Sequence, residues 1–191
     1  MERPKGIIER INKKLTVPLA EKLKDKYYIT PNRITWISFI IAGILAPFMI
    51  LEKHFIIASI LVLIGAWLDS LDGDLARVRK QTSKEGEILD AVLDRYVDLL
   101  IISAMIFVER DCLIAGLFAL IGSSLVPYVR ARTEAAGKKS VSTFGSRDIR
   151  NIILVVGLIS GMLCITLWVL AIVANLSACH RFYYAIRREE S

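Results

Sequence analysis

Long apolar blocks separated by short charged segments dominate the sequence. A helix needs about 20 predominantly apolar residues to cross a bilayer. Apolar blocks occupy residues 34–51, 55–68, 88–108, 113–129 and 151–176. The last block, continued to about residue 187, is long enough for two helices that reverse near residues 160–165, where Gly161 permits a tight turn. The pattern therefore predicts an all-α integral membrane protein with six transmembrane helices.

The segment ahead of the first block has a different pattern. Residues 6–26 carry apolar side chains among seven lysines and arginines of residues 5–26, which is typical of an amphipathic helix lying in the plane of the lipid headgroups. A solvated basic leader has a similar composition and stays open as the alternative. We expect an N-terminal cytoplasmic interfacial helix within residues 1–29 and a six-helix membrane domain over residues 30–191. Since the charged start has no apolar stretch, no cleavable signal peptide is expected.

Lysines and arginines are distributed unevenly between the two predicted faces of the membrane. With both termini on one side, that side carries 22 of them, and the opposite side carries only Lys53 and Arg110. Because positively charged loops stay in the cytoplasm, both termini and both long loops are predicted to be cytoplasmic. The same pattern supports an even number of spans, and we expect a multi-pass protein of the cell (plasma) membrane.

The composition excludes an ordinary soluble or disordered protein. Of the 191 residues, 54% are hydrophobic and 23% are charged, and the mean hydropathy is +0.51. The net charge of +6 indicates contact with anionic lipid, and no basic stripe with interleaved aromatic residues indicates nucleic-acid binding. The three cysteines, Cys112, Cys164 and Cys179, have no paired spacing, so neither a disulfide nor a zinc site is expected.

Carboxylates gather at the predicted cytoplasmic ends of the second and third helices. Asp69 and Asp72 lie three residues apart and therefore share one helix face. Asp90 and Asp94, four residues apart, share a face of the next helix, and the short connector lets the two acidic faces converge. Carboxylates at such close range repel unless they bind cations or some are protonated. An oxygen-only ligand set favours Mg²⁺ or Mn²⁺, and solvated helix-end acids are the alternative.

The spacing of these acids resembles the signature of the CDP-alcohol phosphotransferase family. The matching positions read Asp69-x2-Asp72-Gly73-x2-Ala76-Arg77-x8-Gly86-x3-Asp90-x3-Asp94. Members of this family move a phosphoalcohol group from a CDP-linked donor to an acceptor hydroxyl and release CMP. The resemblance also implies six membrane helices behind a leading amphipathic helix, and a homodimer formed through membrane helices.

The resemblance assigns roles to the aspartates and to a nucleotide pocket. The residues implied to hold divalent metal, as two Mg²⁺ or Mn²⁺ ions, are Asp69, Asp72, Asp90 and Asp94. Asp94 is implied to be the catalytic general base as well, taking the proton from the attacking hydroxyl. Gly73 is expected where no side chain fits beside the nucleotide. The residues implied to bind the CDP donor are Pro31, Asn32, Thr35, Asp69, Gly73, Arg77, Ser83 and Gly86.

Three polar residues in this region also have interpretations outside metal binding and catalysis. Asn32, preceded by Pro31, is also suited to cap the first membrane helix. Asp74 lies five residues beyond Asp69, off the shared acidic face, and is predicted to be solvated. Asp98 is expected to be a structural partner of Arg95, without a catalytic role.

A second basic segment points to the acceptor. Residues 128–137 resemble the segment after helix four in phosphatidylinositol-phosphate synthases and their archaeal-lipid counterparts, a branch that takes inositol 1-phosphate as acceptor. The arginines that match its acceptor-phosphate pocket are Arg130, Arg132, Arg147, Arg150 and Arg181. Several guanidinium groups suit a phosphate dianion because they bind it with bidentate hydrogen bonds. The alternative is the general enrichment of arginine in cytoplasmic loops.

Three other functions stay open. The sequence around Arg147 and Arg150 also resembles relatives that join CDP-inositol to inositol phosphate and make di-myo-inositol phosphate phosphate, so the donor is either a CDP-linked lipid or a soluble nucleotide. Another acceptor within the family, such as glycerophosphate, is the second option. The third is an ion-coupled membrane carrier, against which the aspartates cluster at one membrane face and no internal repeat relates the two halves.

Overall fold

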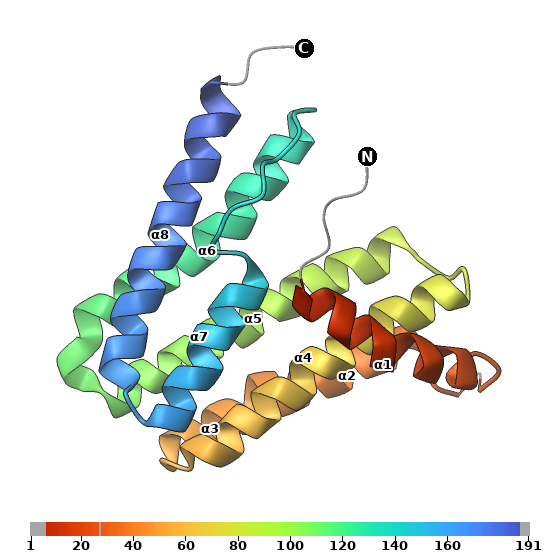
Figure 1. Ribbon diagram of the computed structural model, residues 1–191, viewed down its shortest axis with the longest axis horizontal. Helices are drawn as coiled ribbons and strands as arrows, with labels where there is room; N and C mark the ends of the chain where they lie inside the picture. Colours follow the sequence, from red (N-terminus) through yellow and green to blue (C-terminus); the bar gives the residue numbers. More distant parts are fainter. Residues whose placement is uncertain (1–6, 27, 188–191) are drawn as a thin grey trace. The chain divides into compact units, whose positions relative to one another are not determined.

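The computed structural model describes residues 7–26 and 28–187, with side chains from Lys14 onward. Within these ranges every secondary-structure element is helical (Figure 1). The elements are α1 (Ile7–Leu23), α2 (Pro31–Phe39), the π-helical segment η1 (Ile40–Leu45), α3 (Ala46–Leu51), α4 (Phe55–Val78), α5 (Lys84–Val108), the 3₁₀ turn η2 (Arg110–Cys112), α6 (Leu113–Ala135), α7 (Arg147–Ser160) and α8 (Leu163–Arg187). Because α2, η1 and α3 are continuous, six helices follow α1, as the apolar blocks predict.

Four of these helices have the length and composition of membrane spans. They are Pro31–Leu51, Phe55–Val78, Arg110–Ala135 and Leu163–Arg187. Helix α5 is long enough but carries acidic residues along its first half. Helix α7 has 14 residues, or about 21 Å of helix against a hydrocarbon core of about 30 Å. Among the described residues, the structure therefore supports a helical membrane protein with four candidate spans.

The predicted leading helix is present as α1. Its expected residues 1–6 lie outside the described part of the chain, as do the side chains of residues 7–13, which include three of its apolar positions. The described half of α1 buries Thr16 and Ala20 completely, while Leu15 and Val17 are exposed. One face of this helix is therefore taken up by packing on its own protein, and another presents apolar side chains outward.

The chain divides into two compact units. One contains the described residues up to Ala46 together with Ile60–Val97, and the other contains Pro47–Ser59 and the residues from Asp98 onward. Helices α4 and α5 each contribute to both units, because the division falls within them.

In the first unit, α1 and α2 both pack on α4. Ala20 of α1 belongs to a buried cluster with Leu71 and Leu75 of α4. On the other side, Ser38 Oγ of α2 donates a hydrogen bond to the Gly65 carbonyl at 2.9 Å. A Cβ atom at Gly65 would lie only 2.4 Å from a side-chain carbon of η1, so a larger residue would push these helices apart.

In the second unit, α8 packs on both α6 and α7. Asn175 Nδ2 of α8 donates to the Phe118 carbonyl of α6 at 2.8 Å, and a Cβ at Gly157 of α7 would lie 2.0 Å from Thr166 Oγ1 of α8. The reversal between α7 and α8 falls at Gly161, which has φ of +67°. The predicted turn position at Gly161 is confirmed. Its left-handed backbone conformation is one that glycine adopts without steric cost.

The prediction that the cysteines form no disulfide was wrong. Cys112, at the start of α6, is bonded to Cys164 in the first turn of α8, with a Cα–Cα distance of 5.5 Å. The two residues are 52 positions apart in the sequence. Their proximity comes from the packing of α6 on α8, which sequence spacing does not reveal. Cys179 is an exposed free cysteine.

Thiol labelling tests this disulfide. Protein purified without reductant and then denatured should take up one maleimide per chain, at Cys179, and three after reduction. Intact mass spectrometry distinguishes these states. The Cys179→Ser variant is the matched control and should take up none before reduction and two after it. Three labels per chain without reduction would contradict the bond.

Candidate active site

The α2 helix begins at a polar cap on the edge of a cavity. Thr30 has an extended backbone, with φ −93° and ψ 150°, and its Oγ1 accepts a hydrogen bond from the Arg33 amide at 3.4 Å. Pro31 is the first helical residue, where its missing N–H is not needed. The expectation that Asn32 caps this helix was therefore wrong, because the cap is two residues earlier. Asn32 instead lines the cavity.

The α5 helix begins at the same cavity. Ser83, immediately before the helix, accepts a hydrogen bond on its Oγ from the Gly86 amide at 3.0 Å, which is the contact expected of an N-cap. A Cβ at Gly86 would lie 3.3 Å from Ser83 Oγ and 3.5 Å from Asn32 Oδ1. Gly86 therefore lets the start of α5 come close to the start of α2.

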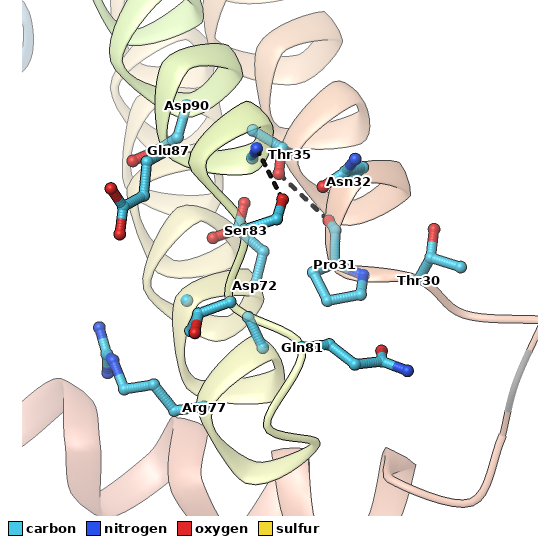
Figure 2. A pocket seen from close by; sticks show the side chains of 14 residues that line it. Thr30, Pro31, Asn32, Thr35, Asp72, Arg77, Gln81, Ser83, Glu87 and Asp90 are labelled. Carbon is cyan, nitrogen blue, oxygen red and sulfur yellow. Dashed lines mark hydrogen bonds between the residues drawn. The ribbon is translucent and has the colours of Figure 1, made fainter.

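The cavity has a volume of about 370 Å³ and is open to solvent (Figure 2). It lies entirely within the first unit, between the starts of α2 and α5 and the end of α4. Seven of the eight residues implied to bind the CDP donor line it: Pro31, Asn32, Thr35, Gly73, Arg77, Ser83 and Gly86. The sequence did not identify five others: Thr30, Ala76, Gln81, Thr82 and Glu87. Ala76 is itself a signature position, and the other four lie between or beside the signature and donor residues, which was the available signal.

Gly73 lines the cavity from α4. A Cβ at this position would meet only the end of the Arg77 side chain, at 3.2 Å from Nη2. A flexible side-chain end moves easily, so helix packing does not account for a glycine here. The arrangement is consistent with the expectation that a bound molecule comes close to the α4 backbone.

Three carboxylates meet beside the cavity. Each of Asp69, Asp72 and Asp90 offers an oxygen atom, and these atoms lie within 4.8 Å of one another. Asp72 and Asp90 also line the cavity, as Figure 2 shows. The convergence of the acidic faces of α4 and α5, predicted from their spacing, is confirmed for these three residues.

The Asp72 carboxylate fits a cation. Asp72 is 6% exposed, and its Oδ2 is buried with no hydrogen-bond partner among the described residues. A buried carboxylate oxygen without a partner, beside two further carboxylates, is costly unless a cation binds it. The ligand atoms are all oxygens, as Mg²⁺ and Mn²⁺ prefer. The trio is therefore suited to a divalent metal ion.

Asp94 lies one turn further along α5 and is not one of these three. Its side chain is 12% exposed, and its Oδ2 lies 3.9 Å from Arg95 Nη2. Asp98, one turn further still, was expected to be a structural partner of Arg95. The structure shows an ion pair between Asp98 Oδ2 and Arg150 Nη2 at 3.2 Å, which gives Asp98 a structural role; its contact with Arg95 stays a prediction.

The prediction that Asp74 is solvated was wrong. Asp74 is 4% exposed, and it accepts hydrogen bonds from Thr16 of α1 and from Arg77. Its position off the acidic face turns it toward α1, and a sequence pattern does not show where α1 packs. Because Arg77 also lines the cavity, Asp74 connects the cavity wall to the leading helix.

The five arginines expected to bind acceptor phosphate all belong to the second unit. Arg130 and Arg132 are on α6, where Arg130 Nε donates to Glu134 Oε1 at 3.0 Å and Arg132 is exposed. Arg181 of α8 donates to the Thr143 hydroxyl at 3.3 Å. The side chains on α6 are the more accessible of these.

The two arginines of α7 differ in their surroundings. Arg147 is the first residue of the helix and is half-buried. Arg150 is 4% exposed; besides pairing with Asp98, it donates to the Gly145 carbonyl at 3.1 Å. Arg150 therefore links α7 to α5 and to the loop before α7.

Comparisons with known proteins identify the family of this chain. The family model of CDP-alcohol phosphatidyltransferases matches residues 28–182. The chain is 32% identical to the archaetidylinositol phosphate synthase of Pyrococcus horikoshii over 96% of its own length and 99% of that protein. It is also 32% identical to a bifunctional IPC transferase and DIPP synthase of Aquifex aeolicus, over 96% of its own length and 45% of that longer protein.

Solved structures with the same fold come from Mycobacterium tuberculosis. Its phosphatidylinositol phosphate synthase with CDP-DAG bound superposes with a TM-score of 0.81 at 25% identity, covering 93% of this chain and all of that one. A second structure of that enzyme, in complex with manganese and citrate, also gives a TM-score of 0.81, over 92% of this chain and 94% of that one. With the family model matching most of its length, this chain belongs to the CDP-alcohol phosphatidyltransferase family and is a membrane transferase.

Proposed function

We propose that this enzyme transfers a phosphatidyl- or archaetidyl-type group from a CDP-alcohol donor to a hydroxyl of inositol 1-phosphate and releases CMP. The observation that carries the proposal is a cavity lined by the implied nucleotide residues and bordered by the Asp69–Asp72–Asp90 trio. The relatives named for archaetidylinositol phosphate and phosphatidylinositol phosphate synthesis support the choice of acceptor.

The donor is proposed to lie with its diphosphate near the acidic trio and Arg77. Arg77 is fixed by Asp74 at one nitrogen while 59% of its side chain stays exposed, so it keeps donors for a phosphate oxygen. Gly73 lets the nucleotide approach α4, and Asn32, Thr35, Ser83 and Gly86 form the facing wall. These contacts orient the donor and exclude water from one side of the reacting phosphate.

Asp69, Asp72, Asp90 and Asp94 are proposed to hold Mg²⁺ or Mn²⁺, as two ions. When bound, the metal neutralises diphosphate charge and stabilises the departing CMP. Asp94 is also proposed as the general base, since it is on the same helix as Asp90 and outside the close trio. It would take the proton from the attacking inositol hydroxyl as the new phosphate ester bond forms and the bond to CMP breaks.

The acceptor's phosphate is proposed to bind to Arg130, Arg132, Arg147, Arg150 and Arg181. Replacing Arg132 with alanine should raise the KM for inositol 1-phosphate by about 10- to 100-fold, because one charge-assisted contact is worth roughly 1.5–3 kcal/mol. The KM for the CDP donor should change little. Initial rates of CMP release at varied acceptor concentration give both values.

The matched control for this experiment is Lys139→Ala. Lys139 is an exposed cation in the loop after α6, and its loss should leave the acceptor KM within about twofold of wild type. Arg150→Ala is a poorer test, because it also leaves the buried Asp98 carboxylate without that ion pair. Equal use of inositol 1-phosphate by Arg132→Ala and wild type would contradict the proposed acceptor pocket.

A second candidate differs in the donor. The resemblance to a bifunctional IPC transferase and DIPP synthase supports CDP-inositol as an alternative substrate, and a glycerophosphate acceptor is the remaining option within the family. Purified protein should be offered CDP-diacylglycerol, its ether-lipid analogue and CDP-inositol, each with inositol 1-phosphate, while CMP is followed. An ion-coupled carrier would release none, and membership of a transferase family already disfavours that role.

The membrane arrangement is proposed to follow the charge distribution. Six spans, with α5 and α7 joining the four candidate spans, would place both termini and the active site on the cytoplasmic side of the cell membrane. The interfacial helix would occupy residues 1–29 and the catalytic membrane domain residues 30–191. A homodimer formed through membrane helices completes this proposal, and cross-linking in native membranes tests it.

A further inference from the structure

Arg79 makes an unusual set of contacts just beyond the end of α4. Its guanidinium donates four hydrogen bonds to main-chain carbonyls: Nη2 to Leu23 at 2.7 Å and to Lys26 at 3.0 Å, Nε to Lys24 at 2.9 Å and Nη1 to Ile29 at 2.7 Å. All three guanidinium nitrogens are used. Arg79 lies outside the family signature, and it does not line the cavity.

These carbonyls belong to the end of α1 and to the segment that leads to α2. Leu23 is the last residue of α1, where helix carbonyls lack partners within the helix and a positive charge is favourable. Ile29 immediately precedes Thr30, the cap of α2. One side chain of α4 therefore fixes the main chain both where α1 ends and where α2 is about to begin.

The position of this segment determines one wall of the cavity. Thr30, Pro31 and Asn32 all line the cavity, and they directly follow the carbonyl that Arg79 binds. The opposite wall is on α4 and α5, and Arg79 is the first residue of the connector between these two helices. Arg79 thus joins the segment before one wall to the end of α4 without lining the cavity.

We propose that Arg79 is a positioning residue for the CDP-donor pocket. It acts by holding the carbonyls of Leu23, Lys24, Lys26 and Ile29, so that Thr30, Pro31 and Asn32 stay at the cavity rim. This inference rests on the proposed donor site. The geometry requires arginine: a lysine has one nitrogen with three donors, which do not reach four carbonyls spread over seven residues. A charge effect on the anionic donor would, in contrast, be preserved by lysine.

Loss of Arg79 should leave the rest of the unit folded. Helix α1 keeps a second attachment to α4, because Thr16 and Ala20 are fully buried there and Thr16 donates to Asp74. The acidic trio is on α4 and α5 and lies outside the α1–α2 segment. The expected effect is therefore confined to the segment and to the pocket wall that follows it.

Two measurements on detergent-purified protein test the proposal. The first is the rate of tryptic cleavage after Lys24 and Lys26, whose carbonyls Arg79 binds, and the second is the Kd for CDP in the presence of Mn²⁺. Arg79→Gln should raise both by about 10-fold, and Arg79→Lys should reproduce most of each change. Lys80→Gln, which removes a neighbouring exposed cation, should change neither. The affinity for Mn²⁺ alone should match wild type in all three variants.

Outcomes that differ from this expectation identify another role for Arg79 or none. Weaker CDP binding without faster cleavage would show that Arg79 acts on the ligand directly, and faster cleavage with unchanged CDP binding would show that the segment does not shape the pocket. Either overturns the inference, as does full rescue of CDP affinity by lysine or a parallel loss of Mn²⁺ affinity. Failure of the wild type to bind CDP would instead overturn the proposed donor site, and the inference with it.

Discussion

Asp72→Asn is expected to abolish CMP release from a CDP-alcohol donor, and Asp69→Asn and Asp90→Asn should do the same. Each change keeps the shape of the side chain and replaces a charged oxygen ligand with a neutral amide. Because a bound cation stabilises the charge of such a transition state by several kcal/mol, its loss should lower turnover by roughly 1,000-fold or more. CMP release under saturating Mg²⁺, measured beside Mn²⁺ binding by electron paramagnetic resonance, checks both consequences.

Stability distinguishes loss of metal from loss of fold in these variants. Metal-free Asp72→Asn should be at least as resistant to thermal unfolding as metal-free wild type, because the change removes a buried charge close to two like charges. Asp111→Asn is the matched control, since Asp111 is an exposed aspartate of η2, and it should retain wild-type turnover. Full activity of the wild type in excess chelator would contradict a metal-dependent mechanism.

The helices were predictable because each is a long apolar or amphipathic segment with clear ends. The reversal at Gly161 followed from the length of the last block, and the left-handed backbone there confirms it. The number of spans was harder to predict. Acidic residues lower the apolar character of α5, and α7 is short. By length and composition, four of the described helices qualify as membrane spans, whereas the charge asymmetry argues for six.

The acidic site was predictable because its geometry is local. Spacings of three and four residues place carboxylates on one helix face, and a short connector brings two such faces together. The same reasoning did not separate Asp94 from the close trio, because a full helical turn from Asp90 shifts it along the axis. The donor residues followed from the family signature, whereas Gln81 and Thr82 belong to a connector without a fixed pattern.

Features that depend on packing between distant segments were not predictable. The Cys112–Cys164 bond joins helices that the spacing of the cysteines does not pair. The burial of Asp74 depends on where α1 lies, and its partner Thr16 is 58 positions away. Arg79 lies in a basic stretch with Arg77 and Lys80, and nothing in that stretch shows that its side chain binds the α1–α2 segment. In each case the local sequence pattern does not show which distant segment the side chain contacts.

Asp94→Asn should lower turnover by about 100- to 10,000-fold, the range expected when a general base is removed, while the Kd for CDP changes little and the affinity for Mn²⁺ falls much less than turnover does. The reason is that Asp94 lies outside the three carboxylates that approach within 4.8 Å, so an amide there removes the proton acceptor and leaves the trio intact. Turnover under saturating substrates and the two binding affinities are the measurements.

Asp72→Asn provides the contrasting pattern, in which Mn²⁺ affinity and turnover fall together. A base role also predicts that Asp94→Asn loses the same factor in kcat as in kcat/KM, because proton abstraction is realised only in the transition state. If Mn²⁺ or CDP affinity instead collapses in Asp94→Asn as far as turnover does, Asp94 is a metal ligand first. The proton of the inositol hydroxyl would then need another acceptor.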